Sequence, residues 1–439
     1  MLPGLSIERG PPLAAPPKFL YTAPWFAFLA GALLLYAGPG ALASRWSPAV
    51  LAATHLLTLG FMMQAMLGAL LQLLPVMAGV PVPGTALVAA IVHPALTAGS
   101  LLLAAGFVFG QPFLFQIAAL LLAAAFVLYL SVICVAFARS WPPRQDSARN
   151  IFIALLGLLV TVVLGLLLLS TFGWGLSWPV TEMTNAHAAW GLVGWTVVLV
   201  LGVSLAVVPM FQMTSNYPAF VARWLGPGAF TALAGWSAGL VLGNAMLAAL
   251  QWAAAAAVAV LAISTLLLQE RSRRRQPDVT FLFWRLGMAC LLSASVLWAA
   301  GQLLGIEASQ PYALVLGVLM IPGFAVCVIC GMLYKIVPFL LWIYLQMKIK
   351  ARPPSVKQIL PDARGIPQFW IHLVAVASLV AASARWHWLV YPGGALLALS
   401  GALLGITIIR ASRFAARHVV PDNLLPPGEA KRTRWTQLR

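Results

Sequence analysis

Hydrophobic residues in this chain are grouped in long, nearly uninterrupted runs, and short polar segments separate them. Each run has about 20 residues or more, the length that an α-helix needs to cross the hydrocarbon core of a bilayer. The pattern predicts an all-α polytopic membrane protein with twelve transmembrane helices. They are expected at residues 19–43, 47–79, 85–109, 112–138, 150–173, 184–212, 227–248, 250–269, 280–304, 310–347, 366–385 and 387–411.

Three of the predicted helices share one spacing, a glycine followed after six residues by a proline. The pairs are Gly68 and Pro75, Gly202 and Pro209, and Gly331 and Pro338. They fall on the second, sixth and tenth helices, so the spacing predicts three pseudo-repeats of four helices. Each proline leaves a carbonyl without its helical partner, which neighbouring helices or water must satisfy within a membrane.

The composition agrees with a membrane domain, since 62% of the residues are hydrophobic and only 8% are charged. The net charge of +17 is concentrated in alternate loops and in the C-terminal tail. Cytoplasmic loops carry the positive excess in membrane proteins, so both termini are predicted to be cytoplasmic and nucleic acid is not an expected partner. We expect a cytoplasmic segment at residues 1–18, one membrane domain at 19–413 and a basic cytoplasmic tail at 414–439. The segment before the first helix has no cleavable signal pattern, and a multi-pass protein of the bacterial inner membrane is predicted.

Two histidines lie near the non-cytoplasmic ends of helices 2 and 6. They are His55 and His187, and each is followed within five residues by a glycine that has an aromatic neighbour. Ionisable residues within spans are functional-site candidates, and neutral imidazole is a common ligand of haem iron and copper. Both are therefore candidate metal and cofactor ligands. The alternative for each is a packing histidine bonded to a neighbouring helix.

Three other residues on the same face are candidates for binding an anionic group. Arg45 and Arg385 each precede a tryptophan, and His387 lies between Trp386 and Trp388. A guanidinium group pairs well with the carboxylates of a buried cofactor. The alternative is ordinary anchoring at the membrane interface.

The remaining polar residues within the spans have simpler interpretations. His93 and His372 are expected to cap or pack. Lys335 either extends to the cytoplasmic surface along helix 10 or lines a polar path. Cys327 and Cys330 form a CxxC on one helix face; we interpret them as packing residues, with a redox or metal role as the alternative.

Twelve helices in three groups of four, with histidines near the outer ends of helices 2 and 6, resemble subunit I of the haem–copper oxidase superfamily. The chain is more similar to the divergent NnrS-like membrane haem–copper proteins linked to nitric oxide stress. The resemblance implies that His55 is a ligand of a low-spin haem, that His187 stands at a copper-ligand position, and that Arg385 pairs with haem propionates. The chain departs from the oxidase pattern, because residues 228–248 and 312–347 lack the histidines that the oxidases carry on helices 7 and 10.

A haem bound through His55 needs a second axial ligand or keeps an open position. His187 is the first candidate for that ligand and Met320 the second. We therefore expect an oxidase-subunit-I-like membrane protein that binds b-type haem and lacks a complete binuclear centre. Copper is a further candidate metal.

The roles that this implies are electron transfer or the handling of nitric oxide, haem or copper. No complete catalytic cluster is visible, so no enzyme activity is assigned; an oxidoreductase would be the class. The expected partners are the lipid bilayer and a redox protein or membrane subunit. The alternatives are a transporter, many of which have two inverted halves and not three repeats, and a cofactor-free structural subunit.

Overall fold

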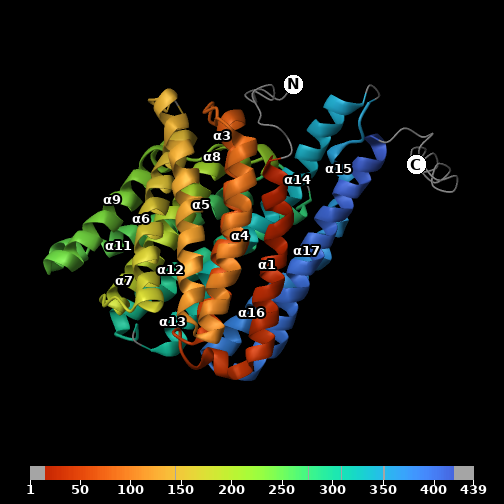
Figure 1. The fold of residues 1–439 in the computed structure, drawn as a ribbon. Helices are drawn as coiled ribbons and strands as arrows, with labels where there is room; N and C mark the ends of the chain where they lie inside the picture. Colours follow the sequence, from red (N-terminus) through yellow and green to blue (C-terminus); the bar gives the residue numbers. More distant parts are fainter. Residues whose placement is uncertain (1–14, 144, 275, 308, 350–351, 420–439) are drawn as a thin grey trace.

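The computed structural model describes residues 15–143, 145–274, 276–307, 309–349 and 352–419 (Figure 1). These residues form helices and connecting segments without a strand, and twelve helices are long and apolar enough to cross a membrane. The prediction of an all-α polytopic membrane protein is therefore confirmed. The spans are α1 (Ala15–Ala37) with η2 (Gly38–Ala43); α2 (Pro48–His55), η3 (Leu56–Met63) and α3 (Gln64–Met77); α4 (Thr85–Phe109); α5 (Pro112–Arg139); α6 (Asp146–Trp174); α7 (Val180–Ala189), η4 (Trp190–Val197) and α8 (Val198–Gln212); α9 (Ala219–Leu242); α10 (Ala245–Ala248) with α11 (Gln251–Glu270); α12 (Val279–Leu304); α13 (Gln310–Val318), η5 (Leu319–Val326) and α14 (Cys327–Lys348); α16 (Ile366–Ala384); and η7 (His387–Leu389) with α17 (Val390–Val419).

The predicted limits differ from the observed ones mainly at two helices. The seventh span begins at Ala219 and not at residue 227, because Pro227 lies inside α9 and does not start it. Membrane helices tolerate an internal proline when their neighbours satisfy the freed carbonyl. The last span continues to Val419, so the first residues of the predicted tail 414–439 are helical. Residues 420–439 of that tail, and residues 1–14 of the predicted segment 1–18, lie outside the described part of the chain.

The threefold repeat is visible in the backbone of spans 2, 6 and 10. Each contains an eight-residue π-helical stretch, namely η3, η4 and η5. Each stretch begins twelve residues before the glycine of the glycine–proline pair, at 56 for Gly68, 190 for Gly202 and 319 for Gly331. Such π-helical insertions often occur at functional sites. The three stretches confirm that spans 2, 6 and 10 are equivalent members of three repeats.

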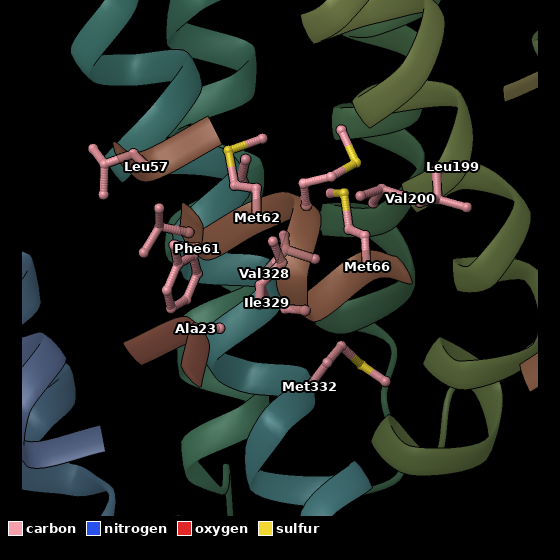
Figure 2. Packing of buried hydrophobic residues seen from close by; sticks show 14 of the residues in the cluster. Ala23, Leu57, Phe61, Met62, Met66, Leu199, Val200, Val328, Ile329 and Met332 are labelled. Atoms are coloured by element: carbon pink, nitrogen blue, oxygen red, sulfur yellow. The ribbon is translucent and has the colours of Figure 1, made fainter. Parts of the chain in front are cut away.

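Spans 2, 6 and 10 form the centre of the molecule. In their most apolar stretches 78%, 67% and 67% of residues are buried, against 28–56% in the other spans. The other helices surround them, and α1 packs along α17, which brings the first and last spans side by side (Figure 1). Side chains from all three central spans meet in the middle of the bundle (Figure 2); they include Met62, Met66, Leu199, Val200, Val328 and Met332.

The motif glycines allow each central span to approach the first helix of its own repeat. A Cβ on Gly202 would lie 3.0 Å from Ile151 of α6, and a Cβ on Gly331 would lie 3.0 Å from Phe283 of α12. The hydroxyl of Ser147 donates to the carbonyl of Gly202 (2.5 Å), and that of Thr280 donates to the carbonyl of Gly331 (2.9 Å). Small residues allow membrane helices to pack this closely.

His372 has a structural role at the π-helical stretch of span 10. Its Nε2 donates to the carbonyl of Pro322 (3.0 Å), and its Nδ1 is bonded to the hydroxyl of Ser400 (3.1 Å). The ring is fully buried. His93 is likewise bonded through Nε2 to Thr22 of α1 (2.8 Å). Both histidines are thus engaged with neighbouring helices.

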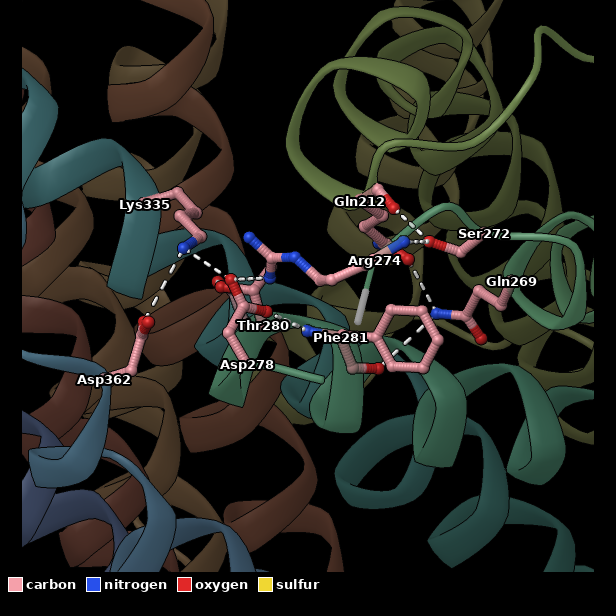
Figure 3. Close-up of polar contacts among 10 residues, drawn as sticks. Gln212, Gln269, Ser272, Arg274, Asp278, Thr280, Phe281, Lys335 and Asp362 are labelled. Atoms are coloured by element: carbon pink, nitrogen blue, oxygen red, sulfur yellow. Dashed lines mark hydrogen bonds and ion pairs between the residues drawn. The ribbon is translucent and has the colours of Figure 1, made fainter. Parts of the chain in front are cut away.

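Lys335 belongs to an ion-pair cluster at the arginine-rich end of the bundle, called here the basic end (Figure 3). Its ammonium lies 2.6 Å from the buried carboxylate of Asp278 and 3.6 Å from Asp362 of η6 (Asp362–Arg364). Arg274 also pairs with Asp278, which accepts a hydrogen bond from the Phe281 N–H at the start of α12 (2.9 Å). The cluster joins the connection before α12, span 10 and the connection after it.

Candidate metal or haem site

The structure brings His55 of α2 and His187 of α7 together across the interface between the first and second repeats. Their ring centroids are 6.5 Å apart and their ring planes differ by 21°. The two residues are not equivalent in the repeat, because His55 lies 13 residues before its motif glycine and His187 lies 15 residues before its own. The pair is therefore formed by packing between repeats and not by symmetry.

Both imidazoles are oriented by a backbone carbonyl. Nδ1 of His55 lies 2.8 Å from the carbonyl of Leu51, and Nδ1 of His187 lies 3.0 Å from the carbonyl of Thr161. A carbonyl only accepts, so in each neutral ring the proton is on Nδ1 and Nε2 keeps its lone pair. Histidines that bind metals usually donate their other N–H to such a carbonyl or to a carboxylate. Both rings thus have the tautomer that a metal ligand requires.

The two rings lie close together and nearly parallel, with centroids 6.5 Å and planes 21° apart. To share one metal ion, each ring would bind it through Nε2 at about 2 Å, so both Nε2 atoms would have to be directed at one position. Within the described ranges no group of three or more His, Cys, Asp or Glu side chains is arranged to hold a metal. The two imidazoles are therefore the protein donors that this site offers.

Aromatic side chains from three helices form an apolar wall beside the pair. Phe107 of α4 stacks on His55, with centroids 5.3 Å apart and planes 27° apart. Phe115 of α5 and Phe172 of α6 meet Phe107 edge-on at 5.2 and 5.6 Å. Such a wall lowers the local polarity, which strengthens interactions at a bound metal.

A stripe of small residues on α6 holds the helix that carries His187. A Cβ on Gly157 would lie 2.3 Å from the carbonyl of Gly194, and a Cβ on Gly165 would lie 2.9 Å from Cε1 of His187. Thr161, between these glycines, supplies the carbonyl that orients the ring. This stripe was not predicted from the sequence. Its signal is the spacing of four residues between successive small side chains, which favours close helix packing.

Replacing Gly165 with alanine is expected to displace the His187 ring by a few tenths of an ångström while leaving the helices in place. If a metal or haem is bound there, its absorption and redox potential should shift, because the ligand orientation changes. The thermal unfolding midpoint should change little. A matched control is Gly228→Ala, where a Cβ would meet nothing within 4 Å; equal spectra for both variants and the wild type would contradict the assignment.

Arg45 connects the beginnings of all three central spans. Its guanidinium Nη1 donates to the side-chain carbonyl of Asn185 (2.8 Å), two residues before His187, and its backbone N–H donates to Gln310 at the start of α13 (3.1 Å). The guanidinium also lies over the Trp46 ring, 4.6 Å from its centroid. Burial lowers the pKa of Arg45 below its usual value. This half-buried cation is bonded to neutral amides next to the histidine pair.

The other predicted site residues lie on different elements and have other partners or surroundings. Arg385 and His387 are exposed in the connection between α16 and α17, where His387 is bonded through Nδ1 to the carbonyl of Ala382 (2.9 Å). Met320 is buried in η5. In the part of the chain that the structure describes, no hydrogen bond, ion pair or ring contact joins these three residues to His55 or His187. Arg45 is the candidate cation that the structure links most directly to the pair.

No protein-family model matches the chain, and no curated protein is significantly similar to it. The resemblance to haem–copper oxidase subunit I accordingly rests on the helix arrangement and on the residues described above.

Proposed function

We propose that this polytopic membrane protein binds a b-type haem through His55 and His187 and takes part in electron transfer. The observation that supports this most is the close pair of nearly parallel imidazoles, with ring centroids 6.5 Å apart, each oriented through Nδ1 by a backbone carbonyl. The pair favours His187 over Met320 as the second axial ligand. A bound haem would supply one-electron chemistry.

The number of protein ligands also indicates which role is favoured. A haem held by both His55 and His187 would have no open coordination site for a gas or substrate. Electron transfer therefore fits this donor set better than oxygen reduction or direct binding of nitric oxide. The chain's own residues would orient the rings, through Leu51 and Thr161, and exclude water, through Phe107. Arg45 would compensate a propionate charge.

Copper is the second candidate, and the same geometry favours it. Two neutral imidazoles are also suitable donors for a copper ion. The proposed function would then be copper handling without a haem. Metal analysis separates the two proposals.

The proposal is tested by purifying the chain in detergent and recording oxidised and reduced absorption spectra, with haem and copper quantified per chain. We expect a low-spin Soret band that shifts on reduction, and about one haem per chain. His93→Ala is the matched control, since His93 is also an intramembrane histidine bonded to a neighbouring helix. Copper at one ion per chain without haem would favour the second candidate. If a folded sample contains neither cofactor, the remaining candidates are a transporter and a cofactor-free subunit.

A further inference from the structure

A cavity of about 270 Å³ lies between α1, α14 and α17 at the basic end, remote in the sequence from the histidine pair. Its walls include Leu20 and Tyr21 of α1, Leu340 and Tyr344 of α14, and Ala416 of α17. These residues lie within about two turns of the ends of their helices. The cavity is therefore at the depth where acyl chains meet lipid headgroups.

The walls are mainly aliphatic, and the polar groups among them are hydroxyls. The hydroxyls of Ser412 and Tyr21 are hydrogen-bonded to one another (2.7 Å), and Ser412 is also 3.0 Å from the carbonyl of Ile408. Tyr344 adds a third hydroxyl. Among the described residues, no charged side chain lines the cavity. Its volume is below the roughly 300–1,000 Å³ of pockets that enclose whole drug-sized ligands, so a single hydrocarbon chain is the better fit.

Basic residues occur close in sequence to the cavity-lining residues of α14 and α17, toward the basic end. Lys348 lies one turn beyond Tyr344 on α14, and Arg410 and Arg413 flank Ser412 on α17. The three helices α1, α14 and α17 contain no aspartate or glutamate. An occupant with an apolar chain and a negative headgroup would match both the walls and the rim.

We propose that this cavity binds an anionic phospholipid of the bilayer, with one acyl chain inside and the phosphate near Lys348 and Arg413. Basic pockets between membrane helices bind anionic headgroups in this way. The bound lipid stabilises the seam where the first span meets the last repeat, because its chain contacts α1, α14 and α17 together. This inference is independent of the proposed haem.

The test measures thermal unfolding of the full-length protein in detergent while phosphatidylglycerol or phosphatidylcholine with identical acyl chains is added. We expect phosphatidylglycerol to raise the unfolding midpoint by several degrees and phosphatidylcholine to raise it much less. The double variant Lys348→Gln/Arg413→Gln should weaken the apparent affinity for phosphatidylglycerol about 10- to 30-fold, since each basic residue near a membrane surface contributes about 1 kcal/mol. Ala416→Phe, which fills the cavity, should reduce the effect of both lipids.

The control is Arg223→Gln/Arg271→Gln, which removes the same charge from the start of α9 and from the residue that follows α11, neither of which lines the cavity. This variant should respond to phosphatidylglycerol like the wild type. Equal stabilisation by both lipids, or an equal loss in the control, would overturn the proposal. The proposal would also be overturned if organic extraction of the purified protein gave a stoichiometric amount of an isoprenoid quinone in place of phospholipid.

Discussion

Replacing either His55 or His187 with alanine is expected to lower occupancy by the proposed haem at least about tenfold, because losing even an outer partner of a metal ligand costs about 10- to 100-fold in affinity and losing the ligand itself costs more. Each variant leaves a single imidazole to hold the iron. Any residual haem should be five-coordinate and high-spin, with a shifted Soret band. Occupancy is measured as haem per chain, and ligation by the absorption spectra of the oxidised and reduced states.

Variants that retain a ligand separate a direct role from a structural one. His187→Met is expected to keep the haem and to raise its reduction potential, since a methionine–histidine pair stabilises reduced iron. His93→Ala should keep the wild-type spectrum. If both alanine variants at His55 and His187 keep a normal Soret band while His93→Ala does too, the ligand assignment is wrong.

Asp278→Asn is expected to lower the free energy of unfolding by about 3–5 kcal/mol, the range observed when one partner of a buried ion pair is removed. The carboxylate of Asp278 is 4% exposed and pairs with both Arg274 and Lys335 (Figure 3). Its loss leaves two partly buried cations with Asp362 as the remaining counter-ion, 3.6 Å from Lys335. Unfolding is measured by thermal or denaturant titration in detergent micelles.

The same carboxylate predicts a pH dependence. Burial acts to raise the pKa of Asp278, but its bonds to Arg274 and Lys335 outweigh burial and hold the pKa below its usual value of 3.8. A depressed pKa contributes stability that is fully present above the unfolded-state pKa of about 3.9 and is lost as the pH falls through the folded-state pKa. The wild type should therefore lose stability below about pH 4, and Asp278→Asn should lose less.

Asp146→Asn is the matched control, because Asp146 also pairs with an arginine, 2.9 Å from Arg149, but its side chain is 37% exposed. Exposed ion pairs contribute about 0–1 kcal/mol, so this variant should remain close to the wild type. Equal stability of the two asparagine variants would show that the cluster around Asp278 is not a stabilising contact.

Hydropathy predicted the number of spans correctly because a bilayer leaves the chain few choices. Backbone groups within lipid must be satisfied internally, which makes each long apolar run a helix. The start of the seventh span was missed because Pro227 resembles a helix start in sequence. In the structure the helix continues through it from Ala219.

The candidate site, like the helix boundaries, was predicted from the sequence only in part. His55, His187 and Arg45 stood out in the sequence, since ionisable groups in or beside apolar runs are rare. The stripe of Gly157, Thr161 and Gly165 was missed, because small residues in an apolar helix are common and their partners lie in another span. Lys335 had two interpretations, and its pairing with Asp278 depends on three segments distant in the sequence.

The sequence by itself determined the twelve spans, the threefold repeat and the presence of two imidazoles near one face of the membrane. Only the tertiary structure decided that His55 and His187 lie beside one another, with nearly parallel rings whose centroids are 6.5 Å apart. The physical reason is that hydropathy and spacing specify where a helix runs along the chain. The direction of a side chain across an interface depends on how each helix is rotated and packed against its neighbours.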